Sequence, residues 1–343
     1  MKIVKPLGVL CVSILYSLCS SAFEYKTACG ELSQEAIASE AALLLSGGAG
    51  AASKDEVPAT RWLLQHAPKG DYLVIRAGGV GRQAKWICDT FPELVGSGAE
   101  ISIDSREDAN HPAVIKLIQS VEVIWIAGGD QNKYENYWKG SALAQALNHH
   151  MSNKPIGGTS AGMAILGSSY YAPESKAVIG SQILNNPYHD ATADIFHEDL
   201  LQHPHLVRTL NETHVNRSLK GETRHNRMFG LLARTVSHFD SIKVRALGLN
   251  EGSFLAIDKD GKGKVFGDEL IILTPLHKPE VIKPGLALIW NHDGQAVKAL
   301  RIEGSHNGAG DLDFKHGVFK GGQIEYWSTS QGNDGFTMAQ ESH

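Results

Sequence analysis

The stretch Pro155-Ile156-Gly157-Gly158-Thr159-Ser160-Ala161-Gly162 contains the pattern Gly-x-Ser-x-Gly, with Ser160 at its centre. Glycines two positions before and after a serine let the chain turn sharply from a strand into a helix, so that the hydroxyl stands clear of the backbone. The N–H groups at the start of that helix can stabilise an oxyanion. Because five residues are a weak signal, an ordinary serine in a glycine-rich turn is the competing interpretation.

The chain before this turn alternates apolar strands with helices. Strands are predicted at residues 43–45, 72–76, 99–103 and 121–126. Apolar strands that alternate with helices are typical of a parallel sheet that is buried on both faces. Ligands of such sheets bind beyond the carboxyl ends of the strands, and Ser160 lies at such an end. The pattern therefore predicts an α/β fold with a mostly parallel sheet between helices, and it favours a catalytic serine.

The C-terminal third of the chain has a different pattern. Antiparallel strands are predicted at residues 265–273, 286–290, 297–302 and 323–327, and a helix at 196–201. Residues 258–264 partly resemble a calcium loop, but lysines fill two of its ligand positions, so we predict a hairpin turn. We expect residues 23–330 to form one domain with a β-rich C-terminal part, followed by a disordered tail over 331–343.

The N-terminus has the layout of a secretory signal peptide. Two lysines precede a mostly apolar run over residues 7–18, and small residues follow it. The run is too short to span a membrane comfortably. We therefore expect cleavage near Ala22, removal of residues 1–22, and export to the periplasm or beyond without stable membrane insertion.

Composition limits the partners and cofactors of the chain. The net charge is −5 and no run of Lys or Arg is present, which argues against nucleic-acid binding. The sequence contains no CxxC or HExxH pattern, so we expect neither a metal nor an organic cofactor. Cys29 and Cys88 remain after signal cleavage. A disulfide between them and two buried thiols are equal alternatives, because spacing along the sequence gives no distance.

A second glycine loop, Ala127-Gly128-Gly129-Asp130-Gln131, follows the strand predicted at 121–126. Its glycines permit close approach of a backbone, and Asp130 and Gln131 bring a carboxylate and an amide to the start of a helix. The loop could supply a second oxyanion N–H. In the alternative interpretation Asp130 only caps the helix. Both can hold, because a capped loop is a rigid support for a site.

A serine nucleophile needs a base whose pKa lies near neutrality, and histidine provides one. His214 follows a strand predicted at 206–210, downstream of Ser160. This is the order of serine and histidine in hydrolases with the same turn. We therefore take His214 as the first candidate among the 16 histidines and His225 as the second.

Taken together, these motifs resemble the cyanophycinase branch of the S51 serine peptidases, the group that also contains dipeptidase E. The likeness covers roughly residues 43–257. It implies a three-layer fold like that of the class I glutamine amidotransferases, with a Ser–His–Glu/Asp triad. The motifs that carry it are, in order, 127–131, 157–162, Asn185-Asn186-Pro187-Tyr188, Glu212-Thr213-His214 and Gly248-Leu249-Asn250-Glu251.

The resemblance implies a role for each motif residue. Ser160 would be the nucleophile, His214 the base and Glu174 the acid. The backbone N–H groups of Gly129 and Ala161 would form the oxyanion hole. The residues implied in substrate binding are Asp130, Gln131, Glu212, Thr213, Arg224 and Arg227.

The arginine segment departs from the family pattern of three closely spaced arginines. Arg224 and Arg227 match the last two, but extra residues separate Arg217 from them. Glu212 and Val215 also stand where the family has Asp and Phe. Cations at a helix start are unfavourable, which favours a role in binding an anionic group over a merely solvated helix end.

We therefore expect an exported serine exopeptidase that cleaves cyanophycin, a poly-aspartate with arginine side chains, into β-aspartyl-arginine dipeptides. Its expected partner is a peptide-like polymer or a dipeptide, and a homodimer is an open alternative to a monomer. Two other functions remain open. An esterase of the α/β-hydrolase type shares the serine turn but leaves the 127–131 loop unexplained. A non-catalytic exported binding protein could use the same fold.

Overall fold

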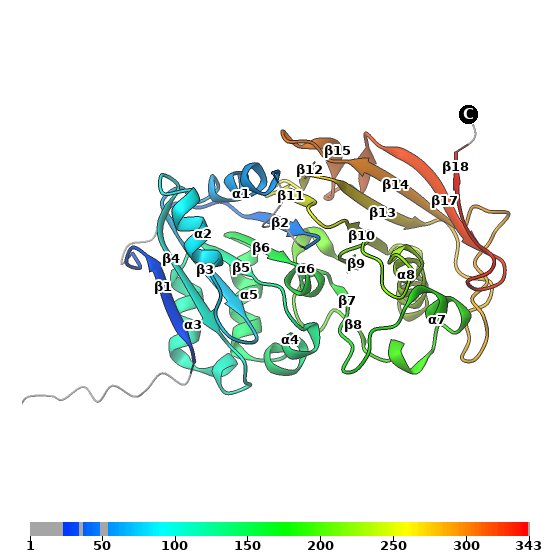
Figure 1. Ribbon diagram of the computed structural model, residues 1–343, viewed down its shortest axis with the longest axis horizontal. Helices are drawn as coiled ribbons and strands as arrows, with labels where there is room; N and C mark the ends of the chain where they lie inside the picture. The colour runs from blue at the N-terminus through cyan, green and yellow to red at the C-terminus, as the bar shows by residue number, and fades with distance from the viewer. Residues whose placement is uncertain (1–22, 34–36, 49–53, 342–343) are drawn as a thin grey trace, which may run out of the picture.

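The computed structural model describes residues 23–33, 37–48 and 54–341. The expected signal peptide, residues 1–22, lies outside this part. Two β-sheets lie next to one another along the long axis of the molecule, the first built mainly from the N-terminal half of the chain and the second mainly from the C-terminal half (Figure 1). We call them sheet A and sheet B.

Sheet A contains the parallel strands that the sequence predicts. Its segments β4, β3, β5, β6 and β2 are neighbours and run parallel, while the pairs on either side of them are antiparallel. The strands found for it in the described residues are, in spatial order, β1 (Tyr25–Cys29), β4 (Val95–Ser102), β3 (Gly70–Arg76), β5 (Val123–Ile126), β6 (Pro155–Thr159), β2 (Ala42–Ser46), β11 (Phe254–Asp258), β12 (Lys262–Phe266), β15 (Ala309–Asp313) and β16 (Val318–Lys320).

Helices cover both faces of sheet A, so the predicted three-layer α/β arrangement is confirmed. Strand β2 illustrates this, since successive side chains of a strand point to opposite faces. Leu43 and Leu45 share an apolar cluster with α3 and α5, whereas Ala42 and Leu44 share another with α1 and α2. The helices on this side of the molecule are α1 (Glu56–Leu64), α2 (Gln83–Thr90), α3 (Pro112–Ser120), α4 (Gln131–Trp138), α5 (Ala142–Met151) and α6 (Ala161–Leu166), with a 3-10 turn at Asp108–Asn110.

Sheet B forms the β-rich part, with α7 (Gly180–Asn185) and α8 (His225–Phe239) beside it (Figure 1). Buried side chains of α8 share one apolar cluster with strands β9, β10 and β13. In spatial order the strands that the structure describes here are β18 (Phe336–Gln340), β17 (Gln323–Thr329), β14 (Val297–Glu303), β13 (Glu269–Pro275), β10 (Arg245–Leu249), β9 (Thr209–Glu212), β7 (Ser169–Tyr171) and β8 (Ile195–His197), with 3-10 turns at Asp190–Thr192 and Pro204–Leu206.

Four local predictions need correction. The tail predicted as disordered contains β18, which pairs with the hydrogen-bonding edge of β17. The predicted helix at 196–201 begins instead within β8, because pairing with β7 overrides its local pattern. Residues 286–290 contribute only single bridges. The strand predicted at 265–273 is divided at Gly267, whose φ of 85° lets the chain pass from β12 in sheet A to β13 in sheet B.

Two predictions about turns and cysteines are resolved by the structure. The segment that partly resembles a calcium loop joins the antiparallel strands β11 and β12, as a hairpin should. Cys29 and Cys88 form a disulfide with a Cα–Cα distance of 6.2 Å. The bond links the edge strand β1 to α2, at the end of sheet A remote from sheet B (Figure 1).

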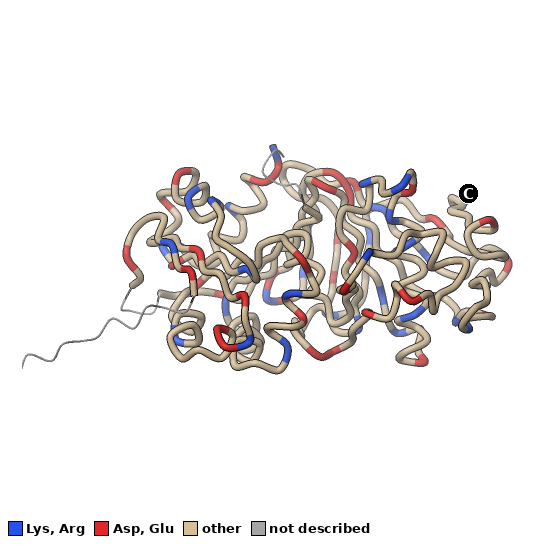
Figure 2. Tube along the Cα trace, turned by 60° about the horizontal axis from the view of Figure 1, so that its bottom comes forward, with Lys and Arg blue, Asp and Glu red and all other residues tan. Residues whose placement is uncertain are grey.

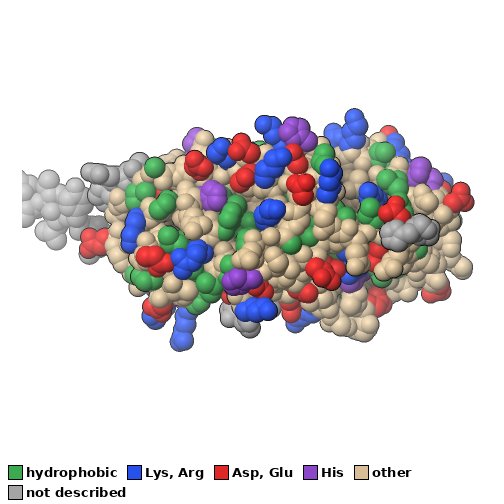
Figure 3. Space-filling model, turned by 90° about the horizontal axis from the view of Figure 1, so that it is seen from above, with side chains coloured by type: hydrophobic (Ala, Val, Ile, Leu, Met, Phe, Trp, Pro, Cys, Tyr) green, Lys and Arg blue, Asp and Glu red, His purple; other side chains and the backbone are tan. Residues whose placement is uncertain are grey.

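Charged residues of both signs are interspersed along the chain (Figure 2). The face seen from above shows the same mixture of acidic and basic side chains (Figure 3). Within the part of the chain that the structure describes, none of the helices is long and apolar enough to cross a membrane.

Candidate active site

Ser160 occupies the sharp turn between β6 and α6. Its φ of 51° and ψ of −115° lie in a region that residues other than glycine rarely adopt, as a nucleophile-presenting turn requires. Close backbone contacts make the turn possible. A Cβ on Gly162 would lie 2.1 Å from the carbonyl oxygen of Ile126, and one on Gly158 would lie 2.7 Å from the Gly162 backbone. The Ser160 N–H donates to the carbonyl of Ser46 at 3.1 Å.

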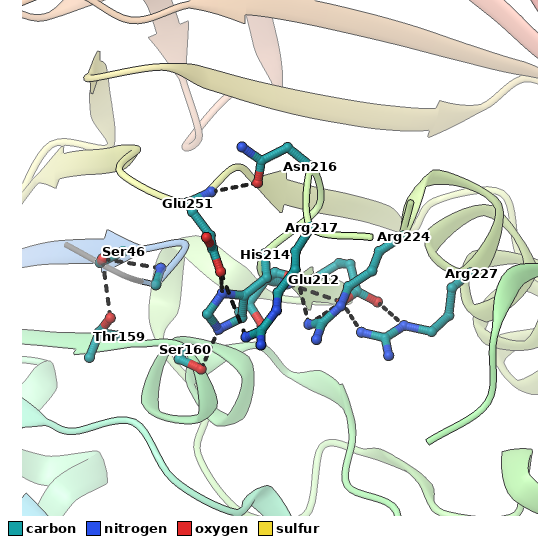
Figure 4. A network of polar contacts seen from close by, with 12 residues as sticks. Ser46, Thr159, Ser160, Glu212, His214, Asn216, Arg217, Arg224, Arg227 and Glu251 are labelled. Atoms are coloured by element: carbon teal, nitrogen blue, oxygen red, sulfur yellow. Dashed lines mark hydrogen bonds and ion pairs between the residues drawn. The ribbon is translucent and has the colours of Figure 1, made fainter. Parts of the chain in front are cut away.

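His214 faces this serine from sheet B (Figure 4). The Ser160 Oγ lies 2.6 Å from His214 Nε2, and the other ring nitrogen, Nδ1, lies 2.7 Å from Glu251 Oε1. The His214 side chain is 12% exposed and that of Glu251 32%. Hydroxyl, imidazole and carboxylate therefore form a continuous hydrogen-bonded series, the arrangement that activates a serine in hydrolases.

The topology explains why these groups meet. His214 follows β9 and Glu251 follows β10, and these two strands are parallel neighbours. The carboxyl ends of parallel strands lie at the same edge of a sheet, so both side chains arrive at one place. Ser160 comes from the end of β6 in sheet A. The candidate site thus lies where the two sheets meet.

The geometry corrects the expectation for the acid. Glu251 has the position beside His214 Nδ1 that the sequence analysis gave to Glu174. Glu174 is exposed, and its backbone N–H donates to the carboxylate of Asp194. A signal for Glu251 was present in the sequence, because it is the carboxylate that closes the motif 248–251.

His225, the second candidate base, lies elsewhere. It opens α8, its Nδ1 lies 2.8 Å from the hydroxyl oxygen of Thr223, and its ring packs against Trp327. Burial lowers the pKa of His225 to about 4, so the ring is neutral at neutral pH. These contacts give it a structural role in sheet B.

The surroundings keep the imidazole of His214 neutral. Burial, the main cause, lowers the pKa of His214 below its ordinary value of 6.5. The hydrogen bond to Glu251 opposes this shift, and the positive charges of Arg224 and Arg217 add to it. An uncharged imidazole at neutral pH can accept the proton of the serine hydroxyl.

The residues expected at the oxyanion hole, Ala161 and Gly129, lie on two backbone segments that border Ser160. Ala161 is the first residue of α6, and the first N–H groups of a helix have no intrahelical acceptor. The loop after β5 approaches from the other side, since a Cβ on Gly128 would lie 3.8 Å from Ser160 Oγ. Gly129 is the next residue of that loop and is exposed. Two backbone segments therefore converge on the hydroxyl.

The start of α4 continues this loop. Asp130 caps the helix, because its carboxylate accepts a hydrogen bond from the Asn132 N–H at 3.0 Å. Gln131 is the first helical residue and is partly exposed. The capping interpretation therefore holds for Asp130, and the cap fixes the loop that carries Gly129.

The residues around His214 divide into buried and accessible groups. Glu212 and Arg227 bind each other through two hydrogen bonds and are 4% and 6% exposed. Thr213 is also buried, and its carbonyl accepts from Arg224. We therefore assign Glu212, Thr213 and Arg227 to support of the loop rather than to substrate contact.

The accessible group contains two arginines. Arg217 is 62% exposed and lies 3.8 Å from the carboxylate of Glu251. The side chain of Arg224 is 18% exposed, and its buried Nε has no hydrogen-bond partner within the described residues. Both cations flank the same side of the triad (Figure 4).

Sequence reasoning assigned no role to the loop after β2. A Cβ on Gly48 would lie 2.1 Å from His214 Cε1, so this glycine packs against the imidazole. Asn216 was also missed, although its side-chain oxygen accepts from the Glu251 N–H at 2.9 Å. The sequence did contain a signal for this loop, because Gly47 and Gly48 directly follow a strand that was predicted to be parallel.

Comparison with known proteins gave a family match and distant likenesses to 15 chains of solved structures, including the two that follow. A peptidase from an acI-B1 Actinobacterium is 15% identical with a TM-score of 0.46, over 73% of this chain and 93% of that one. A protein named as a peptidase E from Listeria monocytogenes EGD-e is 12% identical with a TM-score of 0.38, over 66% and 98%. Comparison with curated proteins gave no match.

The family comparison is more extensive. The model of peptidase family S51 matches residues 42–264, well over half of the chain. This range contains the serine turn of sheet A as well as the histidine and the carboxylate of sheet B. The chain belongs to peptidase family S51.

Proposed function

We propose that the protein is an exported serine peptidase in which Ser160, His214 and Glu251 form the catalytic triad. The observation that carries this proposal is the unbroken series from the Ser160 hydroxyl through His214 to Glu251, with distances of 2.6 and 2.7 Å. Ser160 attacks the carbonyl carbon of a peptide or isopeptide bond while His214 Nε2 takes its proton. Glu251 holds the Nδ1–H tautomer and stabilises the imidazolium.

Two backbone donors stabilise the charge that develops in the reaction. The N–H groups of Ala161 and Gly129 donate to the oxyanion of the tetrahedral intermediate. His214 then returns the proton to the leaving amine, which departs and leaves an acyl-enzyme on Ser160. Water, deprotonated by His214, hydrolyses the acyl-enzyme and restores the free hydroxyl.

The proposed substrate carries carboxylates. Arg217 and Arg224 lie beside the triad, and guanidinium groups bind carboxylates well. The start of α4 adds Asp130 and Gln131, which could contact a cationic or amide group. Cyanophycin, with its aspartate backbone and arginine side chains, fits both features, and its cleavage to β-aspartyl-arginine dipeptides is the proposed activity.

Export is the proposed location of this activity. The lysines and apolar run at the N-terminus have the composition of a signal peptide. The Cys29–Cys88 disulfide supports the proposal, because such bonds persist mainly in oxidising compartments.

Two measurements on the protein from Phe23 onward, beside a Ser160→Ala variant, test this function. The first is covalent labelling by a fluorophosphonate, and the second is digestion of insoluble cyanophycin with products identified by mass. Labelling and dipeptide release that both vanish in Ser160→Ala would support the full proposal.

Labelling without dipeptide release would retain the serine hydrolase and reject the polymer as substrate. Cleavage of short acyl esters alone would then indicate an esterase. Absence of both labelling and release would reject the catalytic role of Ser160 and leave a binding protein.

A further inference from the structure

Three successive backbone carbonyls at the end of β2 accept hydrogen bonds from the segments that carry the proposed triad. The first belongs to the last residue of β2 and the others to the two glycines that follow. Their donors come from different parts of the fold, one in sheet A and two at strand ends of sheet B. The bonds run from Ser160 N–H to Ser46 O (3.1 Å), from His214 N–H to Gly47 O (2.9 Å) and from Gly252 N–H, next to Glu251, to Gly48 O (3.0 Å).

The Ser46 side chain strengthens this arrangement. Its hydroxyl oxygen accepts from the Thr159 hydroxyl at 3.2 Å and from the Gly48 N–H at 3.4 Å. Ser46 is 1% exposed, so water cannot replace a lost partner easily. Figure 4 shows the contact of Ser46 with Thr159, the residue before the nucleophile. One buried hydroxyl therefore connects Thr159 with Gly48, the glycine beside the base.

Gly48 brings this segment into contact with the imidazole. Its φ is 114°, a conformation that side chains rarely tolerate. A Cβ at this position would also lie within 2.6 Å of both ring nitrogens of His214. The backbone of Gly48, which carries no side chain, thus limits the positions that the imidazole of His214 can occupy.

We propose that Ser46–Gly48 is the segment that sets the distance between nucleophile and base, with the Ser46 hydroxyl as its positioning residue. The proposal rests on the proposed triad. Ser160 belongs to sheet A and His214 to sheet B, so their 2.6 Å contact depends on how the sheets are joined. The segment makes that connection, because it ends a strand of sheet A and binds the loops that follow β9 and β10 of sheet B.

The first test is Ser46→Ala, with Ser102→Ala as the matched control. Ser102 also ends a parallel strand of sheet A, is 2% exposed and makes a side-chain hydrogen bond, but to Asp104. Loss of the Ser46 hydroxyl should lower kcat about 10-fold with KM unchanged, since small misplacements of reacting groups are costly. The fluorophosphonate labelling rate should fall equally. Equal rates in Ser46→Ala and wild type, or equal losses in both variants, would overturn the proposal.

A second variant keeps the test decisive if Ser46→Ala does not fold. Gly48→Ala should lower kcat about 100-fold, because the new Cβ displaces the imidazole. Gly317→Ala is the control, since Gly317 also has positive φ (68°) but no atom within 4 Å of an added Cβ. Similar activity in Gly48→Ala and Gly317→Ala would overturn the role of the segment.

A readout that does not depend on turnover separates this inference from the proposed function. The Nδ1 proton of His214 in its hydrogen bond to Glu251 should give a downfield proton resonance in NMR spectra. Ser46→Ala and Gly48→Ala should shift or broaden this resonance, and the two controls should leave it unchanged. If the wild-type protein fails to react with a fluorophosphonate, the proposed function is rejected. The resonance of the His214 Nδ1 proton then tests by itself whether Ser46–Gly48 positions the imidazole. An unshifted resonance in both variants would overturn that positioning role.

Discussion

The two halves of the candidate site are fixed by different physical means. In sheet A the nucleophile is placed by backbone lying on backbone, because Gly158 has no side chain to separate β6 from α6 and Gly162 has none to separate α6 from the end of β5. In sheet B a charge pair is added to such backbone contacts, since the loop that carries His214 is also held by the buried Glu212–Arg227 pair. The first half therefore depends on the absence of side chains, and the second depends in addition on a buried pair of charges.

The largest expected effect is on the charged half. Glu251→Gln should lower kcat about 10⁴-fold, because the amide can favour the wrong tautomer of His214 and cannot stabilise its charged form. Steady-state kinetics on the substrate established by digestion would measure the loss. Glu174→Gln is the matched control and should retain wild-type activity. Full activity in Glu251→Gln would remove it from the triad.

The next effect is on stability in the same half. Arg227→Met should lower the free energy of unfolding by about 3–5 kcal/mol, because the buried Glu212 carboxylate loses both of its hydrogen bonds to a guanidinium and keeps only Arg224, 3.8 Å away, as a cationic neighbour. Denaturant unfolding followed by circular dichroism would measure it. Lys85→Met breaks an exposed pair with Asp89 and should cost less than about 1 kcal/mol. Equal costs for the two variants would contradict the contrast between buried and exposed pairs.

A smaller cost is expected in the half that depends on glycine. Gly162→Ala should lower the free energy of unfolding by about 1–3 kcal/mol, because its Cβ would meet the carbonyl of Ile126. The helix must move to relieve this contact, so the rate of fluorophosphonate labelling should fall as well. Thermal unfolding and labelling of the same sample would check both. An unchanged labelling rate would show that the turn can relax without moving Ser160.

The smallest expected effect is that of pH on activity, through protonation of His214. Because the pKa of His214 lies below 6.5, its neutral form persists to mildly acidic pH. We expect kcat/KM to fall to half of its plateau value at a pH below 6.5, and to decrease about tenfold per pH unit further below the pKa of the imidazole. Replacing Arg224 by Met should raise that pKa and move the fall to higher pH, which a pH–rate profile would detect. A half-maximal kcat/KM at a pH above 6.5 in wild type would contradict the assigned environment of the base.

The sequence was most informative where backbone geometry demands particular residues. The glycines around Ser160 predicted the turn, and the apolar strands predicted the parallel part of sheet A. His214 followed from the order of serine and histidine together with its place after a strand. These features are local, or depend on the common rule that parallel strands end at one edge.

The features that were missed depend on contacts between distant segments. Glu251 meets His214 because β9 and β10 are neighbours, a pairing that neither segment encodes alone. The same holds for Gly48, whose contact with the imidazole joins residues far apart in the chain. The strand β18 likewise forms because β17 offers an edge, although its own residues are mostly exposed.

The location of Ser160 and His214 at the junction of the two sheets has a consequence for how the protein folds. A chain in which only the first sheet has formed holds a serine without a base, and one in which only the second has formed holds a base without a serine. Under the proposed mechanism, the protein can hydrolyse a substrate only after sheet A and sheet B have packed against each other. The rate at which fluorophosphonate labelling recovers during refolding therefore reports when the two sheets pack together. A partly folded molecule would not hydrolyse other proteins.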